Sequence, residues 1–430
     1  MPVSTALLTD HYEFTMLDAA LQSGTAHRQC VFEVFGRRLP TGRGYFVNAG
    51  TGRLLDLIGD FAFGPDELEH LSRTQVVSPG TLDWLAEYRF TGDIEGYPEG
   101  ELFFPGSPLM TLRTDFATGV ILETLVLSVL NHDVAVASAA SRMWVQARGR
   151  TLIEMGSRRA HEQAAVAAAR AAWIAGFDTT SNVEAGRSHG IPTAGTAAHS
   201  FTLLHDDERA AFAAQVAALG VGTTLLVDTF DTMTGIANAL AVAGRQLGAI
   251  RLDSGDLGML AGRARAVLDA AGATDTRILA SSDLDEYAIA ELADAPVDSY
   301  GVGTSVVTGS GSPAAGLVFK VVAVDGHPVA KTAASGKTSM GGQKQAARRI
   351  GADGVATAEL VWTGSAGLQA PEALTDADRR LVAPLVRAGV RVDTSTLADA
   401  RARHAAAVAE LPELGRALRS PGAAIPTLRV

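Results

Sequence analysis

The chain has 430 residues, of which 47% are hydrophobic, so it is long enough for two or three domains with a large buried core. Its formal net charge of −11 at pH 7 argues against non-specific binding to nucleic acid and against docking on an anionic membrane surface. The single cysteine, Cys30, excludes an intramolecular disulfide framework and a zinc site made of cysteines.

The N-terminal region, residues 1–115, is predicted to form a helix followed by a β-rich domain. Its first residues lack the basic flank and the long apolar core of a signal peptide. The stretch Thr9-Asp10-His11-Tyr12 opens the helix and places Tyr12 in its first turns. Apolar residues then alternate or cluster between Gly and Pro in three candidate strands, Cys30–Phe35, Gly44–Asn48 and Phe90–Tyr97.

A helical pattern runs from about Phe116 to Arg148 and leads into a second domain, expected at residues 116–310. Its most apolar part, near Val120–Leu130, carries Glu123 and is too short to span a bilayer. Together with the missing signal peptide, this predicts a soluble cytoplasmic protein.

Within this second domain, short apolar strands alternate with helical segments, and strand ends recur roughly every 20 to 30 residues. The candidate strands are Thr151–Met155, Ile191–Thr196, Thr224–Asp228, Ala249–Asp253, Ile278–Asp283 and Ser299–Thr304. The helices between them include Arg159–Ala175, Thr234–Ala243, Met259–Ala271 and Asp285–Ala293. Nearly every strand finishes in Asp, Ser, Thr or Glu, so these polar groups should gather on one rim. An irregular (β/α) barrel fits best, with a doubly wound open sheet as the alternative.

The C-terminal segment, residues 311–430, begins with a Gly/Ser-rich loop and the candidate strand Leu317–Val324, which ends at a turn at Asp325-Gly326. The last hundred residues are rich in Ala and Arg and are predicted to be helical.

The stretch Gly195-Thr196-Ala197-Ala198-His199-Ser200 directly follows Ile191–Ala194, whose apolar character predicts a buried strand. A histidine at a strand end can transfer protons, bind a metal or carry a phosphoryl group. A satisfied core histidine is the default for one that stands alone. No pair of histidines has the spacing of a zinc site such as H-E-x-x-H, which argues against a metallohydrolase.

Three further stretches carry groups suited to anions or to a ribose. Arg251-Leu252-Asp253-Ser254-Gly255-Asp256 places two carboxylates three residues apart, which suits a ribose diol or a Mg²⁺-bridged phosphate, or equally a helix cap with a structural ion pair. Gly156-Ser157-Arg158-Arg159 combines helix-start amides with arginines, or is a solvated helix face. Gly301–Thr308 has the glycines and hydroxyls of a phosphate loop, or of an ordinary turn.

In this order, the motifs resemble those of nicotinate phosphoribosyltransferases. The matching stretches, from residue 7 to about 345, are Leu7-Leu8-Thr9-Asp10-x-Tyr12, Gly156-Ser157-Arg158-Arg159-Ala160, Gly195-Thr196-x-x-His199-Ser200, Arg251-Leu252-Asp253-Ser254-Gly255-Asp256 and Gly301-x-Gly303-Thr304. The resemblance implies a type II phosphoribosyltransferase-like α/β fold. In that fold an irregular (β/α) barrel accompanies an N-terminal β-rich α/β domain that C-terminal segments complete.

The resemblance also implies the reaction, in which nicotinate and phosphoribosyl pyrophosphate give nicotinate mononucleotide and pyrophosphate in NAD salvage, coupled to ATP hydrolysis. It implies that ATP phosphorylates His199 and that Thr196 and Arg251 contact nicotinate. Tyr12 would stack on the pyridine ring, reaching in from the partner subunit of a homodimer with shared active sites.

For the second substrate, the resemblance implies that Thr304, with Gly303 and Ser305 in its loop, holds the 5′-phosphate of phosphoribosyl pyrophosphate. Arg158 and Arg159 would meet the phosphates. Asp253 and Asp256 would act in catalysis by binding hydroxyls or Mg²⁺.

Two positions bear on the choice of substrate. Asn182 stands where related nicotinamide-using enzymes have an acidic residue; an acid accepts from a carboxamide but repels a carboxylate, so Asn182 favours nicotinate. Met155 stands where many relatives have an aromatic residue, and a thioether–ring contact can substitute for it. The competing functions are a nicotinamide phosphoribosyltransferase and a non-catalytic pyridine-nucleotide sensor on the same fold.

Overall fold

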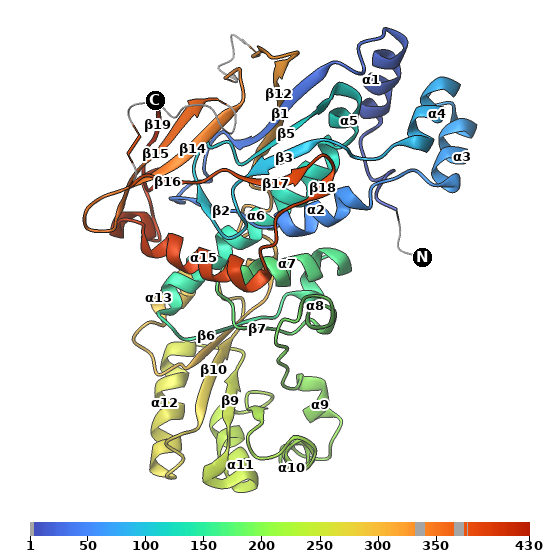
Figure 1. Ribbon diagram of the computed structural model, residues 1–430. Coiled ribbons are helices and arrows are strands. Elements are labelled where there is room, and N and C mark those ends of the chain that lie inside the picture. The colour runs from blue at the N-terminus through green and yellow to red at the C-terminus, as the bar shows by residue number, and fades with distance from the viewer. Residues whose placement is uncertain (1–3, 332–339, 365–373, 376) are drawn as a thin grey trace. The chain divides into compact units, whose positions relative to one another are not determined.

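The computed structural model describes residues 4–331, 340–364, 374–375 and 377–430. The chain forms two compact units, Met1–Ala135 together with Ser312–Val430, and Val136–Gly311 (Figure 1). Residues 116–135, which the sequence assigns to the second domain, group with the first unit instead. The reason is that side chains such as Val120, Ile121 and Val129 lie in the hydrophobic core of that unit.

The main sheet of the first unit combines strands from both ends of the chain. Within the described residues its order is β13-β12-β1-β5-β3-β17-β18. The inner strand β1 (Gln29–Gly36) pairs antiparallel with β5 (Met110–Asp115) and with β12 (Leu317–Val324). The remaining members are β3 (Asp93–Gly96), β13 (His327–Pro328), β17 (Ala383–Arg387) and β18 (Val390–Arg391). The expected completion of the N-terminal domain by C-terminal segments is therefore confirmed.

A second sheet of this unit consists of C-terminal strands in the order β16-β14-β15-β19, so the expectation of helix throughout the last hundred residues is wrong. Its members are β14 (Lys344–Ile350), β15 (Ala356–Thr363), β16 (Arg379–Arg380) and β19 (Thr427–Arg429). Ala and Arg favour helix, but the long antiparallel pairing of β14 with β15 buries most side chains of β15 and overrides that local preference. The helix of this region, α15 (Leu397–Ala409), begins at a capping box between Thr396 and Asp399.

The first unit also contains helices, of which α5 contacts β1 and β5 of the main sheet, and a ladder of two short strands. The helices are α1 (His11–Gln22), α2 (Thr51–Gly59), α3 (Pro65–Thr74), α4 (Pro79–Glu87) and α5 (Phe116–Ile121), with the short η3 (Glu413–Arg416) near the C-terminus. The short strands are β2 (Phe46–Val47) and β4 (Leu102–Phe103). In the core, the rings of Phe32 on β1 and Phe319 on β12 stack with centroids 4.9 Å apart, which joins the two ends of the chain by apolar contact.

The helical pattern predicted from about Phe116 to Arg148 is confirmed as α5 and α6 (Glu123–Ala147). The expectation that its apolar part, near 120–130, is too short to span a bilayer is wrong, because the Ala-rich residues 134–140 lie in the same helix of 25 residues. By length and composition α6 could cross a membrane, but 72% of its most apolar window is buried inside the protein. The burial identifies α6 as a core helix.

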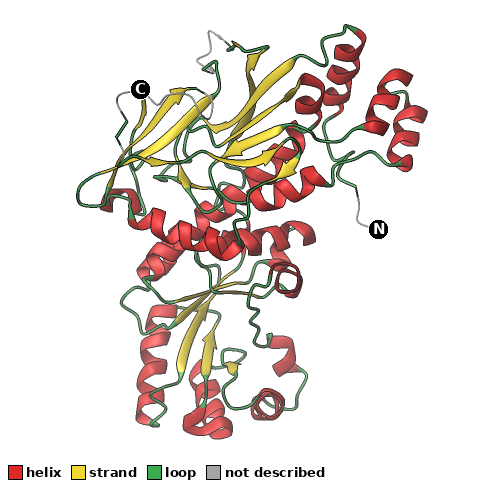
Figure 2. Cartoon of the chain, in the orientation of Figure 1, coloured by secondary structure: helices red, strands yellow, loops and turns green. Residues whose placement is uncertain are grey.

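The second unit is built on a parallel sheet in the order β7-β6-β11-β10-β9-β8 (Figure 2). The strands are β6 (Thr151–Glu154), β7 (Thr179–Thr180), β8 (Thr224–Leu226), β9 (Ala249–Leu252), β10 (Arg277–Ser281) and β11 (Ser299–Val302). Consecutive strands of the chain pair with each other, and the last strand, β11, also pairs with the first, β6. Within the described residues, the ring of strands is open only between β7 and β8. This is the strand order of an irregular barrel, and it excludes a doubly wound sheet, whose strand order reverses at a switch point.

Helical segments connect the strands of this sheet. They are η1 (Ser157–Arg159), α7 (Glu162–Ile174), α8 (Val183–His189), α9 (His199–Leu203), α10 (Glu208–Leu219), α11 (Thr232–Ala243), η2 (Gly244–Gln246), α12 (Leu257–Ala270), α13 (Glu286–Glu291) and α14 (Thr304–Val307). Several begin with an aspartate or asparagine whose side chain accepts from the first-turn amides, so the polar residues after the strands also start helices.

Candidate active site

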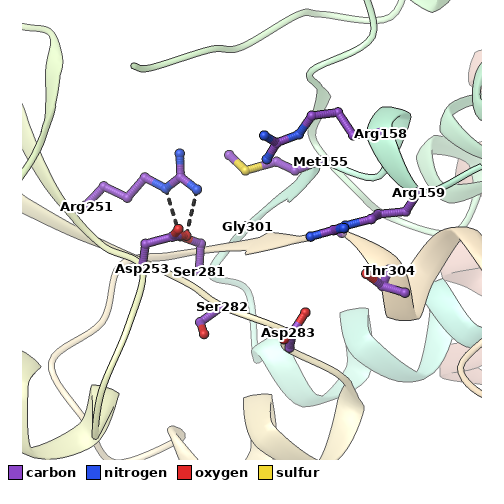
Figure 3. A pocket seen from close by; sticks show the side chains of 11 residues that line it. Met155, Arg158, Arg159, Arg251, Asp253, Ser281, Ser282, Asp283, Gly301 and Thr304 are labelled. Carbon is purple, nitrogen blue, oxygen red and sulfur yellow. Dashed lines mark hydrogen bonds and ion pairs between the residues drawn. The ribbon is translucent and has the colours of Figure 1, made fainter. Parts of the chain in front are cut away.

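A cavity of about 240 Å³ opens beyond the carboxyl ends of β6, β9, β10 and β11, the place where parallel α/β sheets bind ligands. Its lining residues are Met155, Arg158, Arg159, Arg251, Asp253, Ser281, Ser282, Asp283, Gly301, Gly303 and Thr304 (Figure 3). Most of the site residues named from the sequence therefore share one cavity. Figure 3 shows Arg251 on one side of it, with Arg158 and Arg159 extending in from the other.

Arg251, at the end of β9, is the central donor of the cavity. Its Nε donates to Ser281 Oγ at 2.8 Å, its Nη1 to Thr196 Oγ1 at 3.2 Å and its Nη2 to Asp253 Oδ1 at 2.7 Å. The side chain is only 14% exposed, and these three partners fix the plane of its guanidinium. A planar, oriented guanidinium suits a carboxylate or a phosphate.

Asp253 is held as a carboxylate. Burial alone would raise its pKa, but hydrogen bonds from Ser281 and Arg251, together with the charge of Arg251, hold the pKa below its usual value. Its Oδ1 accepts from Ser281 Oγ at 2.5 Å as well as from Arg251. Its Oδ2 faces His199 Nε2 at 3.7 Å. The cavity therefore presents a fixed negative charge beside a fixed positive one.

His199 lies at the first position of α9, with its ring 42% exposed. Its Nε2 faces Asp253, and its Nδ1 lies 3.2 Å from the hydroxyl of Thr229, just beyond β8. The imidazole is thus open to a reactant and oriented from both ring nitrogens. These are the requirements for a nucleophilic or proton-transferring histidine.

The segment before His199 is not the buried strand that the sequence predicts. Residues 191–198 form a single parallel bridge, between Thr180 and Thr193, and only Ile191 among them is buried. Pro192 has no N–H, so the pairing with β7 is limited to Thr180 N donating to Pro192 O and Ala194 N donating to Thr180 O. This irregular segment follows β7 where the strand order of the barrel is interrupted.

Two glycines allow the close packing beneath the cavity. A Cβ on Gly156, directly after β6, would lie 2.1 Å from Val307 Cγ1 on α14. A Cβ on Gly301 would lie 2.8 Å from Met155 Sδ. Only glycine leaves space for these neighbours, and the thioether of Met155 therefore lies against the backbone of β11.

Six residues named from the sequence lie outside the cavity lining, of which Thr196 contacts Arg251 and His199 faces Asp253. Asn182 caps α8, accepting from Ala185 N and donating to Ser157 Oγ at 3.0 Å. Asp256 caps α12 by accepting from Met259 N. Ser305 follows Thr304 in α14. Tyr12 is on α1 in the first unit, and 45% of it is exposed. The full set is Thr196, His199, Asn182, Asp256, Ser305 and Tyr12.

The expected magnesium pair does not fit a protein-held ion. Asp253 Oδ1 is occupied by Arg251 and Ser281, and the Asp256 carboxylate caps a helix. Among the residues that the structure describes, no three His, Cys, Asp or Glu side chains are grouped to hold a metal. Mg²⁺ usually reaches such sites bound to phosphates, so it belongs with the phosphate substrates.

Several residues at this site were not singled out from the sequence. Ser281, Ser282 and Asp283 line the cavity, and the last two have φ of 126° and 35°, a conformation that is strained for residues with a Cβ. The polar residues at the end of the expected strand 278–283 could have indicated that these three side chains lie at the site. Nothing in the sequence pointed to Thr229.

Glu154, at the end of β6, is a buried carboxyl group behind the cavity. It accepts from Gly156 N and, at 2.5 Å, from Thr180 Oγ1, while burial raises its pKa above the usual value despite these hydrogen bonds. It fixes the turn that leads to Arg158 and Arg159.

Comparison with solved structures first defines the class, a phosphoribosyltransferase fold. The human nicotinic acid phosphoribosyltransferase superposes with a TM-score of 0.86 at 27% identity, over 98% of this chain and 97% of that one. The nicotinate-nucleotide pyrophosphorylase of Pyrococcus furiosus shares the fold, with a TM-score of 0.78 at 23% identity over 94% and 95% of the two chains. The expected fold class is confirmed.

Sequence comparison then gives the family. A family model described as nicotinate phosphoribosyltransferase (NAPRTase) N-terminal domain matches residues 7–131. The nicotinate phosphoribosyltransferase pncB1 of Mycobacterium tuberculosis is 57% identical over 98% of this chain and 94% of its own length. The Bacillus subtilis nicotinate phosphoribosyltransferase is 37% identical over 75% and 67%. The chain belongs to the nicotinate phosphoribosyltransferase family, as its motifs indicate.

Proposed function

We propose that this protein is a nicotinate phosphoribosyltransferase that joins the ring nitrogen of nicotinate to C1 of phosphoribosyl pyrophosphate, releasing pyrophosphate and forming nicotinate mononucleotide for NAD salvage. The observation that carries the proposal is the cavity in which three arginines outnumber two carboxylates, because both substrates are anions. Family membership at 57% identity supports the same reaction.

Nicotinate binds through its carboxylate to Arg251 and Thr196 in this proposal. The guanidinium is already oriented by Ser281, Thr196 and Asp253, so little side-chain freedom is lost on binding. A carboxamide cannot form the same charge-assisted pair, which favours nicotinate over nicotinamide. Asn182, which donates to Ser157 at the edge of the same loop, adds no negative charge there.

Phosphoribosyl pyrophosphate, with its bound Mg²⁺, occupies the opposite side of the cavity. Arg158 and Arg159 neutralise its phosphates, and Thr304 with Gly303 and Ser305 holds the 5′-phosphate at the start of α14. As the C1–oxygen bond to pyrophosphate breaks, positive charge develops on the ribose, and Asp253 stabilises it. The nicotinate nitrogen supplies its own electron pair, so no general base is required.

ATP enters as a second phosphoryl substrate. The imidazole of His199 attacks the γ-phosphorus, the N–P bond forms as the bond to the β,γ-bridging oxygen breaks, ADP leaves, and the ring proton stays on the other nitrogen. The exposure of the ring and its proximity to Asp253 support this role. Hydrolysis of the phosphohistidine then accompanies synthesis of the nucleotide.

A homodimer in the cytoplasm completes the proposal. Tyr12 and Met16 lie one turn apart on α1 and are 45% and 36% exposed, and Leu8 just before the helix is 64% exposed. An exposed apolar face of this kind supports contact with a second copy, to whose active site Tyr12 contributes a ring for stacking on the pyridine.

The test compares nicotinate with nicotinamide as substrate in the presence of phosphoribosyl pyrophosphate, Mg²⁺ and ATP. We expect turnover of nicotinate with a much higher kcat/KM, and acid-labile phosphate on His199 by mass spectrometry after incubation with ATP. Preference for the amide would assign the chain to nicotinamide instead. Binding of pyridine nucleotide without turnover of either compound would identify a sensor.

A further inference from the structure

We propose that Asp228 and Thr229, consecutive residues just beyond β8, are positioning residues that hold Asp253 and His199 for catalysis. The inference rests on the proposed function, because Thr229 has this task only if His199 accepts a phosphoryl group. Neither residue lines the cavity of Figure 3, and both act through the groups that they contact.

Asp228 holds the backbone at Asp253. Its Oδ2 accepts from Asp253 N at 2.7 Å and from Ser254 Oγ at 2.8 Å. These two bonds fix the start of the turn from Asp253 to Gly255, whose φ of 83° lets the chain reverse. The direction in which the Asp253 side chain leaves the backbone is therefore set by Asp228, as well as by Arg251 at its far end.

Thr229 holds the ring of His199. Its hydroxyl lies 3.2 Å from Nδ1, and within the described ranges this is the one hydrogen bond of the imidazole. The opposite ring nitrogen faces Asp253 Oδ2 at 3.7 Å. Two neighbouring residues of one loop thus act on the carboxylate and on the histidine that face each other.

The histidine needs such a partner because its own segment gives little support. Residues 192–198 are irregular and partly exposed, and the His199 side chain is 42% exposed. The loop after β8 is better anchored, because Val227 is fully buried and its N–H donates to Arg251 O. The hydroxyl of Thr229, on the anchored loop, therefore orients the ring of His199, on the less constrained segment.

The buried position of Asp228 is also unfavourable for the stability of the fold. It is 9% exposed, and its Oδ1 is buried without a hydrogen-bond partner among the residues that the structure describes. Burial of an unpaired carboxylate oxygen costs free energy. A residue selected for stability would avoid this arrangement, which favours a role in the site.

The test measures single-turnover transfer of labelled γ-phosphate from ATP to His199, and steady-state kinetics of synthesis without ATP. Thr229→Val, which keeps the shape but removes the hydroxyl, should slow phosphorylation about tenfold. Thr229→Ser should restore it to within about twofold of wild type. The KM for nicotinate without ATP should not change in either variant, because the contact between Arg251 and Thr196 is intact.

Asp228→Ala should slow both phosphorylation and ATP-independent turnover by about a hundredfold, because two hydrogen bonds to the turn are lost. Asp228→Asn keeps one acceptor oxygen and should recover most of the rate. The matched control is Asp231→Asn, three residues further on, whose carboxylate caps α11 and which should stay within about twofold of wild type.

Phosphorylation of Thr229→Val at the wild-type rate would overturn the role of Thr229, as would failure of Thr229→Ser to rescue. A loss in the Asp231→Asn control as large as that in Asp228→Ala would reduce Asp228 to a structural residue. If Asp228→Ala does not fold, Asp228→Asn and the threonine variants decide. A wild-type chain that makes nucleotide but takes up no phosphate would overturn the phosphohistidine step and the role of Thr229. The rate of ATP-independent turnover in the Asp228 variants would then decide the role of Asp228.

Discussion

At the scale of single residues, the site depends on groups that are fixed before any substrate arrives. Arg251 is the clearest case, since each of its three nitrogens has a partner and its side chain is mostly buried. The partners hold the fork in one plane and leave its donors aimed at the cavity (Figure 3). Such preorganisation is what makes an arginine selective for planar anions.

Arg251→Lys tests this fork. A lysine keeps the charge but offers one nitrogen, so it cannot hold Thr196 and Asp253 and also bind a carboxylate in two places. We expect the KM for nicotinate to rise roughly 10- to 100-fold. The control is Arg187→Lys on α8, where the side chain is 74% exposed and pairs with Glu184. Equal KM values for the two variants would show that charge alone binds the substrate.

At the scale of elements, the sequence predicted the strands of the barrel better than it predicted the connections. Thr151–Met155 and Ala249–Asp253 match β6 and β9 closely, because short apolar runs that end at polar groups have few alternatives in an α/β chain. Ile191–Thr196 looked the same by composition, but Pro192 and exposure to solvent leave it irregular. Local pattern does not encode whether a neighbouring strand is present.

The residues of the candidate site were likewise only partly predictable from the sequence. The motif residues Arg251 and Asp253 could be named from the sequence because their spacing and order are specific. The partner Thr229 could not, because its contact with His199 joins positions 30 residues apart through the way that β8 and α9 are placed. Likewise, the strained backbone at Ser282 is visible only in three dimensions.

The packing of η1 and β6 on α14 leads to a second variant, Gly156→Ala. The added Cβ would lie 2.1 Å from Val307 Cγ1, so the free energy of unfolding should fall by about 1 to 3 kcal/mol. Because the closest contacts of the added Cβ are with Val307, the double variant with Val307→Ala should be more stable than the sum of the two single losses predicts. Urea denaturation of all three variants measures this coupling.

Gly262→Ala is the matched control for that series. Gly262 is in α12 with no other atom within 4 Å of the added Cβ, so alanine should raise the free energy of unfolding by about 0.5 to 1 kcal/mol. Strict additivity between Gly156→Ala and Val307→Ala would contradict the proposed contact.

At the scale of the whole molecule, the chain leaves the first unit near residue 135 and returns to it at 312. The returning segment is held by buried polar contacts as well as by strand pairing. Lys344 donates to both carboxylate oxygens of Glu33 at 2.9 Å, and Arg348 donates to Glu359, which also accepts from Tyr97. Loss of one partner would leave a buried charge, which ties the folding of this unit to its ionisation state.

His404 on α15 makes that dependence measurable. It is fully buried, and burial, with a smaller effect of Arg401, lowers its pKa from 6.5 to about 3. The unfolded chain therefore binds a proton more readily than the folded one. The stability contributed by the neutral ring is complete above pH 6.5 and is lost as the pH falls from 6.5 towards 3, by about 1.4 kcal/mol per pH unit.

Measurement of the free energy of unfolding from pH 7 to pH 5 tests this expectation. Wild type should lose stability across this range, whereas His404→Gln should show a flatter dependence because the titrating ring is gone. Burial raises the pKa of Glu33 and Glu359, which acts in the opposite sense, so the difference between variant and wild type is the decisive quantity. His70→Gln, at an exposed position of α3, should keep the wild-type slope. Parallel curves for wild type and His404→Gln would show that His404 does not govern the acid sensitivity of the fold.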